Sequence, residues 1–178
     1  MKILAFDCAL EACSVAITDN DEVVAECCEL RARGHAEVLM PMIERVRLEA
    51  AVNYRDLDLI AVTIGPGSFT GIRVGVAAAR GMSIAMEKPA IGVSTLAALA
   101  DQAVEETDDT TQILSIIDAR RSEAYVQLFD VKRGRLSPAW EQPELDTIEN
   151  IASRVNGRIG TVIGSGAVKL LELVPDRM

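Results

Sequence analysis

The sequence that decides the fold is Gly65-Pro66-Gly67-Ser68-Phe69-Thr70-Gly71-Ile72-Arg73, which joins an apolar strand to an alanine-rich helix. The run before it, residues 57–64, is rich in β-branched side chains and stops at a Gly-Pro-Gly sequence that neither a strand nor a helix interior accommodates. Ser68 or Thr70 can cap the following helix, so free backbone N–H groups point out of the loop and attract an anion. The stretch predicts a tight strand-turn-helix unit.

The loop fits neither of two common phosphate-binding motifs. A Walker A loop needs Lys and then Ser or Thr after its second spaced glycine, whereas Ile72-Arg73 follows Gly71. The dinucleotide pattern GxGxxG also fails, since Thr70 stands where the third glycine would fall. Two interpretations of the glycines stay open, a close-packed turn and an anion-binding turn.

Composition narrows the class of protein. A chain of 178 residues with 49% apolar content can bury the core of one domain or of two small α/β lobes. Its net charge of −9, without a basic block, disfavours binding of RNA or DNA by the chain alone. Aromatic residues are only 3%, so stacking surfaces for single strands are few. We expect any nucleic acid to be held by a partner.

The cysteines and the N-terminus bear on location and metals. Cys8, Cys13, Cys27 and Cys28 lie within strand-like sequence, and with His35 as the single histidine they match no zinc spacing. We expect buried reduced thiols and no metal. The N-terminal apolar run reaches an acidic residue too soon for a signal peptide, and no later stretch has the length of a membrane span. These features predict a cytoplasmic protein that does not contact a membrane.

Hydrophobic periodicity predicts one supersecondary pattern used twice. Pro41 is expected to bend or restart the first helix. The repeated order implies two ribonuclease H-like lobes, residues 1–106 and 107–178, of the kind found in the actin, hexokinase and Hsp70 superfamily. The expected strands are 2–7, 12–18, 23–28, 57–64, 90–93, 113–118, 124–130, 136–141 and 160–163, and the expected helices are 36–51, 70–86, 94–106, 144–155 and 168–174.

That superfamily implies a nucleotide between the lobes, its phosphates met by two hairpins that each begin with an acid. The matching acids are Asp7 and Asp118, but neither hairpin has the glycine that lets backbone N–H groups approach a phosphate. Glu11 and Glu123 would in addition repel a triphosphate. We therefore expect only vestigial nucleotide or anion contacts. The residues expected to make them are Asp7, Gly67, Ser68, Thr70, Asp118, Gly164 and Gly166.

Several separated segments agree with one family. GPGSFTG at 65–71 is the most specific. Weaker matches lie in the expected order and spacing at 3–7, 11–16, His35 with 39–43, 91–96 and 117–120. Together they resemble the bacterial TsaB family, also called YeaZ, a partner of TsaD in making N6-threonylcarbamoyladenosine in tRNA. The resemblance implies a scaffold that docks on a TsaD-like catalytic subunit, helps to recruit a TsaE-like ATPase, and meets tRNA only through the complex.

The resemblance also implies that the chain is not an enzyme. TsaD-like enzymes have a histidine pair for their metal on the helix after the segment equivalent to 91–93, where this chain has Ser94-Thr95-Leu96-Ala97-Ala98-Leu99. His35 precedes an apolar helix face, which favours a local capping or packing role. The alternative that stays open is an ATP-dependent phosphotransferase or ATPase that holds magnesium with Asp7 or Asp118. A peptidase is disfavoured, since Ser68 has no histidine partner identifiable in the sequence.

A helical surface is the expected binding site, because TsaB proteins pair with TsaD, or with themselves, through the first helices of the N-terminal lobe. No cofactor is expected beyond a weak or partner-shared adenine nucleotide. TsaB relatives continue into a longer tail, so the second lobe is expected to be shortened. The same apolar side chains can instead pack on the chain's own sheet, and the sequence leaves this alternative open. The expected interface residues are Leu39, Met42, Ile43, Val46, Gly71, Gly75, Ala78, Ala79 and Met82.

Overall fold

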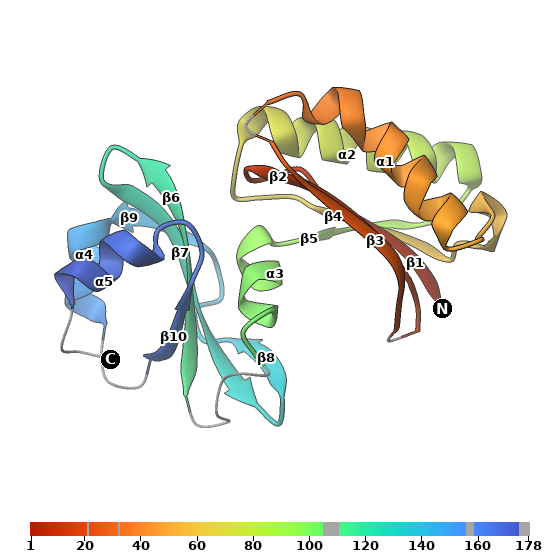
Figure 1. Cartoon of the computed structure of the whole chain (residues 1–178). Helices are drawn as coiled ribbons and strands as arrows, with labels where there is room; N and C mark the ends of the chain where they lie inside the picture. The colour runs from red at the N-terminus through yellow and green to blue at the C-terminus, as the bar shows by residue number, and fades with distance from the viewer. Residues whose placement is uncertain (21, 32, 105–110, 156–158, 175–178) are drawn as a thin grey trace. The chain divides into compact units, whose positions relative to one another are not determined.

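The chain folds as two compact units, Met1–Thr95 and Leu96–Met178. The computed structural model describes residues 1–20, 22–31, 33–104, 111–155 and 159–174. Each unit contains its own five-stranded sheet with helices packed against it (Figure 1). The predicted fold class, α/β with two ribonuclease H-like lobes, is confirmed. The division predicted after residue 106 falls among residues 105–110, which lie outside the described residues.

The sheet of the first unit combines an antiparallel meander with two parallel strands. β1 pairs antiparallel with β2 and β2 with β3, whereas β4 lies parallel to β1 and to β5. The order across the sheet is β3-β2-β1-β4-β5. The strands are β1 (Lys2–Asp7), β2 (Ala12–Asp19), β3 (Glu22–Leu30), β4 (Leu59–Thr63) and β5 (Ala90–Val93).

Two helices cover one face of this sheet, α1 (His35–Glu49) and α2 (Phe69–Met86), as Figure 1 shows. A short 3-10 turn, Tyr54–Asp56, lies between α1 and β4. α1 runs through Pro41 as one helix, so the expected restart there is wrong. Pro41 is exposed, and so is Glu37, whose carbonyl loses its helical partner to the proline.

The second unit is built around the long β6–β7 hairpin. β10 lies parallel to β6, while β7 pairs antiparallel with β6, β8 and β9. α3 (Thr95–Asp101) begins at the boundary between the units, and α4 (Ile148–Arg154) and α5 (Ala167–Leu173) complete the described helices. The strands are β6 (Gln112–Arg120), β7 (Glu123–Lys132), β8 (Arg135–Pro138), β9 (Glu144–Thr147) and β10 (Ile159–Ile163).

The helix predicted over 144–155 is present as α4, but its predicted start is wrong. Residues 144–147 were expected to begin a helix, but they form β9 against the Glu123 end of β7. The helix starts only at Ile148, because the hydroxyl of Thr147 accepts the N–H of Asn150 at 3.2 Å and caps α4. An open strand edge thus outweighs the local helical preference of this segment.

The glycine loop packs against the β1–β2 hairpin. A Cβ on Gly67 would lie 2.3 Å from the carbonyl oxygen of Ala9, and one on Gly71 would lie 1.8 Å from that of Cys8. The N–H of Ser68 donates to the same Ala9 oxygen at 2.7 Å. Backbone therefore meets backbone at a distance that only glycine allows, and this contact positions the start of α2.

Gly71→Ala should lower the free energy of unfolding by about 2 to 3 kcal/mol, because the added methyl group meets a main-chain oxygen that has little room to move. Gly81→Ala, in the same helix, is the matched control, since a Cβ there meets nothing within 4 Å. The control should raise the free energy of unfolding by about 0.5 to 1 kcal/mol. Urea unfolding of both variants measures the difference, and equal effects would contradict the close approach at Gly71.

Candidate functional site

Asp7 stands at the end of β1, where the superfamily places its first phosphate hairpin. Its Oδ1 accepts hydrogen bonds from the N–H of Ala9, at 2.9 Å, and from the hydroxyl of Thr63. Thr63 is the last residue of the neighbouring strand β4. The carboxylate thus joins the β1–β2 hairpin to β4. Its recorded partners all come from within the first unit.

The loop residues Gly67, Ser68 and Thr70 lie at the start of α2. Ser68 is the N-cap, as expected, and its hydroxyl oxygen accepts the N–H of Gly71 at 3.3 Å. The N–H of Ser68 donates a hydrogen bond to the carbonyl oxygen of Ala9. Thr70 is exposed. Two of the N–H groups that an anion would use therefore already have partners. The close-packed interpretation of the glycines accounts for these contacts.

Asp118 makes a denser set of contacts in the second unit. Its Oδ2 accepts a hydrogen bond from the ammonium of Lys169 at 2.6 Å, and its Oδ1 accepts one from the N–H of Arg120 at 2.9 Å. Its own N–H donates to Oγ of Ser165 at 3.1 Å. The Lys169 ammonium, followed by the Arg120 N–H, holds the pKa of the Asp118 carboxyl below its ordinary value.

The structure brings Asp118 together with the predicted glycine loop. Gly164 has a φ of +114°, and a Cβ there would lie 2.2 Å from the carbonyl oxygen of Ile116. The same oxygen accepts the N–H of Gly166 at 3.2 Å. Sequence reasoning missed Lys169 and Ser165, which complete this cluster. The available signal was a lysine in the first turn of the helix that follows the loop.

The turn after Asp118 has left-handed backbone without glycine. Arg120, Arg121 and Ser122 have φ angles of 71°, 53° and 65°. Such angles favour glycine, and here they are adopted by residues with side chains. The structure thus agrees with the sequence in placing side chains, and no glycine, in the turn after Asp118.

The predicted interface residues lie inside the first unit. All but Ala78, which is half-buried, are buried, so these residues pack within the first unit in this structure. The buried stripe of α2 is Gly71, Gly75, Ala79 and Met82. The opposite, exposed stripe, here called the α2 outer stripe, consists of Phe69, Arg73, Ala77, Arg80, Gly81 and Ile84.

The α2 outer stripe combines small and apolar side chains. Phe69 is 68% exposed and Ile84 is 79% exposed, which is unusual for large apolar residues. The guanidinium of Arg73 lies 3.7 Å from the centre of the Phe69 ring. Helical spacing could have found this stripe, because it is the face opposite the buried glycines.

His35 is buried, and its Nε2 lies 3.1 Å from the carbonyl oxygen of Leu10, which agrees with the expected local role. In the part of the chain that the structure describes, no three His, Cys, Asp or Glu side chains are grouped so that they could hold a metal ion. None of the helices described there is long and apolar enough to cross a membrane.

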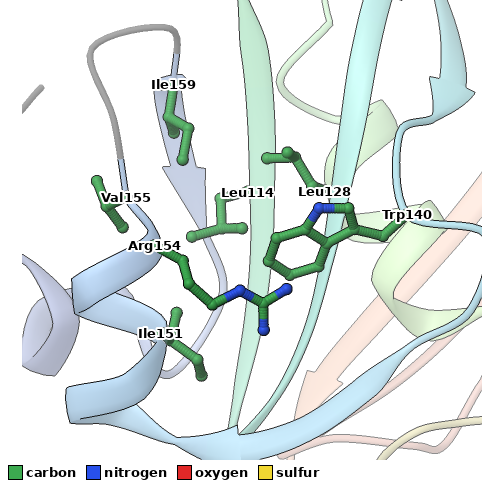
Figure 2. A pocket seen from close by; sticks show the side chains of 7 residues that line it. All are labelled: Leu114, Leu128, Trp140, Ile151, Arg154, Val155 and Ile159. Atoms are coloured by element: carbon green, nitrogen blue, oxygen red, sulfur yellow. The ribbon is translucent and has the colours of Figure 1, made fainter.

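A pocket of about 250 Å³ opens in the second unit. Figure 2 shows its five aliphatic side chains, among them Leu114 and Ile151, together with Trp140 and Arg154. The guanidinium of Arg154 lies 4.0 Å from the centre of the Trp140 ring and also pairs with Glu144 at 2.6 Å. No predicted site residue lines this pocket.

Comparison with known proteins identifies the family of the chain. The family model of TsaD, tRNA N6-adenosine threonylcarbamoyltransferase, matches residues 27–159. The solved structure of YeaZ from Pseudomonas aeruginosa is 32% identical with a TM-score of 0.75, over 84% of this chain and 69% of that chain. The chain belongs to the TsaB/YeaZ family. The resemblance inferred from GPGSFTG is confirmed.

Two further relatives describe the extent of the match. A solved structure described as an uncharacterized protein with similarity to peptidase YeaZ from Pseudomonas aeruginosa has a TM-score of 0.79 and 26% identity, over 97% of this chain and 91% of that chain. TsaB of Escherichia coli (strain K12) is 42% identical over 125 residues, which are 70% of this chain and 53% of that protein. The chain spans about half the length of the curated TsaB relatives it matches.

Lys169→Met should raise the pKa of Asp118 toward its ordinary value of 3.8, since it removes the ammonium that does most to lower this pKa. A pH titration that follows the Asp118 carboxyl carbon by NMR measures the change. Lys132→Met is the control, because Lys132 pairs with Asp130 instead, at 3.4 Å. An unchanged Asp118 titration in Lys169→Met would contradict the ion pair.

The sign of the stability effect follows from the lowered pKa. The native carboxylate stabilises the fold above pH 3.8, and this stabilisation is lost as the pH falls through the lowered native value. Because the Lys169 and Asp118 side chains are 52% and 24% exposed, solvent screening keeps the contribution below about 1 kcal/mol.

Proposed function

We propose that this chain is a non-catalytic scaffold subunit for N6-threonylcarbamoyladenosine modification of tRNA, the modification next to the anticodon. It binds a TsaD-like catalytic subunit, helps to recruit a TsaE-like ATPase, and meets tRNA only through the complex. The observation that carries the proposal is the ion pair between Asp118 and Lys169 in a TsaB/YeaZ chain. Asp118, the acid that a nucleotide-dependent enzyme of this superfamily would use, already has its charge paired with Lys169.

The first acid supports the same proposal. Asp7 accepts hydrogen bonds from Ala9 and Thr63, and the adjoining loop N–H of Ser68 is taken by Ala9. The names of the curated relatives supply the pathway, since TsaB proteins are described as tRNA threonylcarbamoyladenosine biosynthesis proteins. We place the protein in the cytoplasm, where tRNA is modified.

The α2 outer stripe is the surface that we propose for the TsaD-like partner. Gly81 and Ala77 allow a second helix to approach closely, because a Cβ on Gly81 meets nothing within 4 Å. Phe69 and Ile84 supply exposed apolar area on the same helix. A second copy of this chain can occupy the stripe when the partner is absent. The buried residues Leu39 and Ala79 are unsuitable for a test, since their substitution would disturb the core.

Ala77→Arg and Gly81→Arg should each reduce co-purification of the TsaD-like subunit by about tenfold or more, as expected when a long charged side chain enters a packed interface. Glu172→Arg, which changes an exposed residue in the second unit, is the matched control and should bind normally. Circular dichroism checks that all three variants fold.

The same variants test function in cells depleted of their own TsaB. The modified nucleoside, measured by mass spectrometry of digested tRNA, should be restored by the wild-type chain and by Glu172→Arg, and lost with Ala77→Arg. Full modification by Ala77→Arg would rule out this stripe. Failure of the wild-type chain itself to bind a TsaD-like subunit or to restore the modification would rule out the scaffold role.

We further propose that the isolated chain binds ATP weakly or not at all, and that any adenine nucleotide is shared with the partner. Calorimetric titration with Mg-ATP should give no saturable heat. The reason is that Asp118 is already paired with the ammonium of Lys169, and the turn after Asp118 contains no glycine. Tight binding with hydrolysis that Asp7→Asn abolishes would overturn this proposal. That outcome would support an ATP-dependent enzyme instead.

A further inference from the structure

Two thiols face each other at the loop end of the β1–β2 hairpin. The last recorded pair of this ladder is Asp7 with Ser14, so Cys8 and Cys13 occupy the next facing positions. Their sulfur atoms lie 3.6 Å apart. Both side chains are buried, with 1% and 0% exposure.

We propose that Cys8 and Cys13 form a reversible disulfide, an oxidative modification site within the first unit. A disulfide requires a sulfur–sulfur distance of about 2.05 Å, so the two atoms must approach by about 1.5 Å. Rotation of two facing side chains supplies most of this movement, because the hairpin already holds their main chains opposite each other. The proposal does not depend on the proposed function.

The other two cysteines lack this geometry. Cys27 lies in the same core, on β3, with Val15 rather than a cysteine as its register partner. Cys28 is exposed and pairs in register with Ser14. Cys8 and Cys13 are therefore the pair that can close without a change of strand register.

The oxidant that we name is a small peroxide. A thiolate sulfur attacks one peroxide oxygen, the O–O bond breaks, and the product is a sulfenic acid with hydroxide, which takes a proton to become water. The second thiol sulfur then attacks the sulfenic sulfur, the S–S bond forms, and a second water leaves. The two sulfurs lose two electrons in total, and the peroxide oxygens gain them.

Burial raises the pKa of both thiols, so the reaction is slow while the hairpin stays closed. Either sulfur can donate the hydrogen bond between them, so either one can attack the peroxide first and the other then resolves the sulfenic acid. Access comes from local opening of the hairpin, whose loop residue Glu11 is exposed.

The experiment treats the reduced chain with hydrogen peroxide, blocks the remaining thiols under denaturing conditions, and maps the products by mass spectrometry. The wild type should lose two of its four alkylatable thiols and yield a peptide linked through Cys8 and Cys13. A dithiol reductant should restore both thiols. Cys27→Ala, a matched buried control, and Cys28→Ala should still form the link, whereas Cys8→Ala and Cys13→Ala should not.

Mapping of the wild-type protein decides the question even where a variant fails to fold. Oxidation that stops at sulfinic acid on separate cysteines, or that links only Cys28 between two chains, would overturn the proposal. A Cys8–Cys13 link found only after denaturation would overturn it as well, since the native register would then play no part.

Discussion

The contact on which the first unit depends is the meeting of two stretches of main chain, the glycine loop and the β1–β2 hairpin. Gly71 and Gly67 face the carbonyl oxygens of Cys8 and Ala9 at distances that exclude any side chain. α2 can therefore begin directly over the hairpin, and its buried stripe reaches the sheet. The same contact leaves the opposite stripe exposed, so the requirement for close packing determines which residues a partner could meet.

This constraint gives a structural reason for the glycines of a motif that resembles a phosphate loop. Glycines in phosphate loops leave room for a ligand, whereas here the chain itself occupies that room. Ser68 follows the same pattern, because its N–H and its hydroxyl both bind main chain. A glycine pattern in the sequence indicates that some group packs closely against the main chain. Only the structure shows whether that group is a ligand or, as here, another segment of the chain.

The sequence predicted most of the fold because its signals are local. β1 and β5 have the expected bounds, and Ser68 caps α2, since apolar runs, glycines and capping residues act over a few positions. β9 was missed because its stability comes from pairing with β7, which lies more than a dozen residues away. Similarly, Lys169 reaches Asp118 across 51 positions of sequence. The α2 outer stripe was missed although Arg73 and Arg80 lie on it, because the small residues of the opposite stripe were assigned to a partner rather than to the chain's own sheet.

The ion pair of Asp118 with Lys169 has a consequence for how the second unit keeps its shape. In a nucleotide-dependent enzyme, a magnesium ion from solution neutralises an acid of this kind, so the loop that carries the acid responds to the presence of the nucleotide. Here the counter-ion is covalently part of the protein and is always present at full stoichiometry. The turn around Asp118 therefore carries its own counter-charge, which comes from α5 of the same unit.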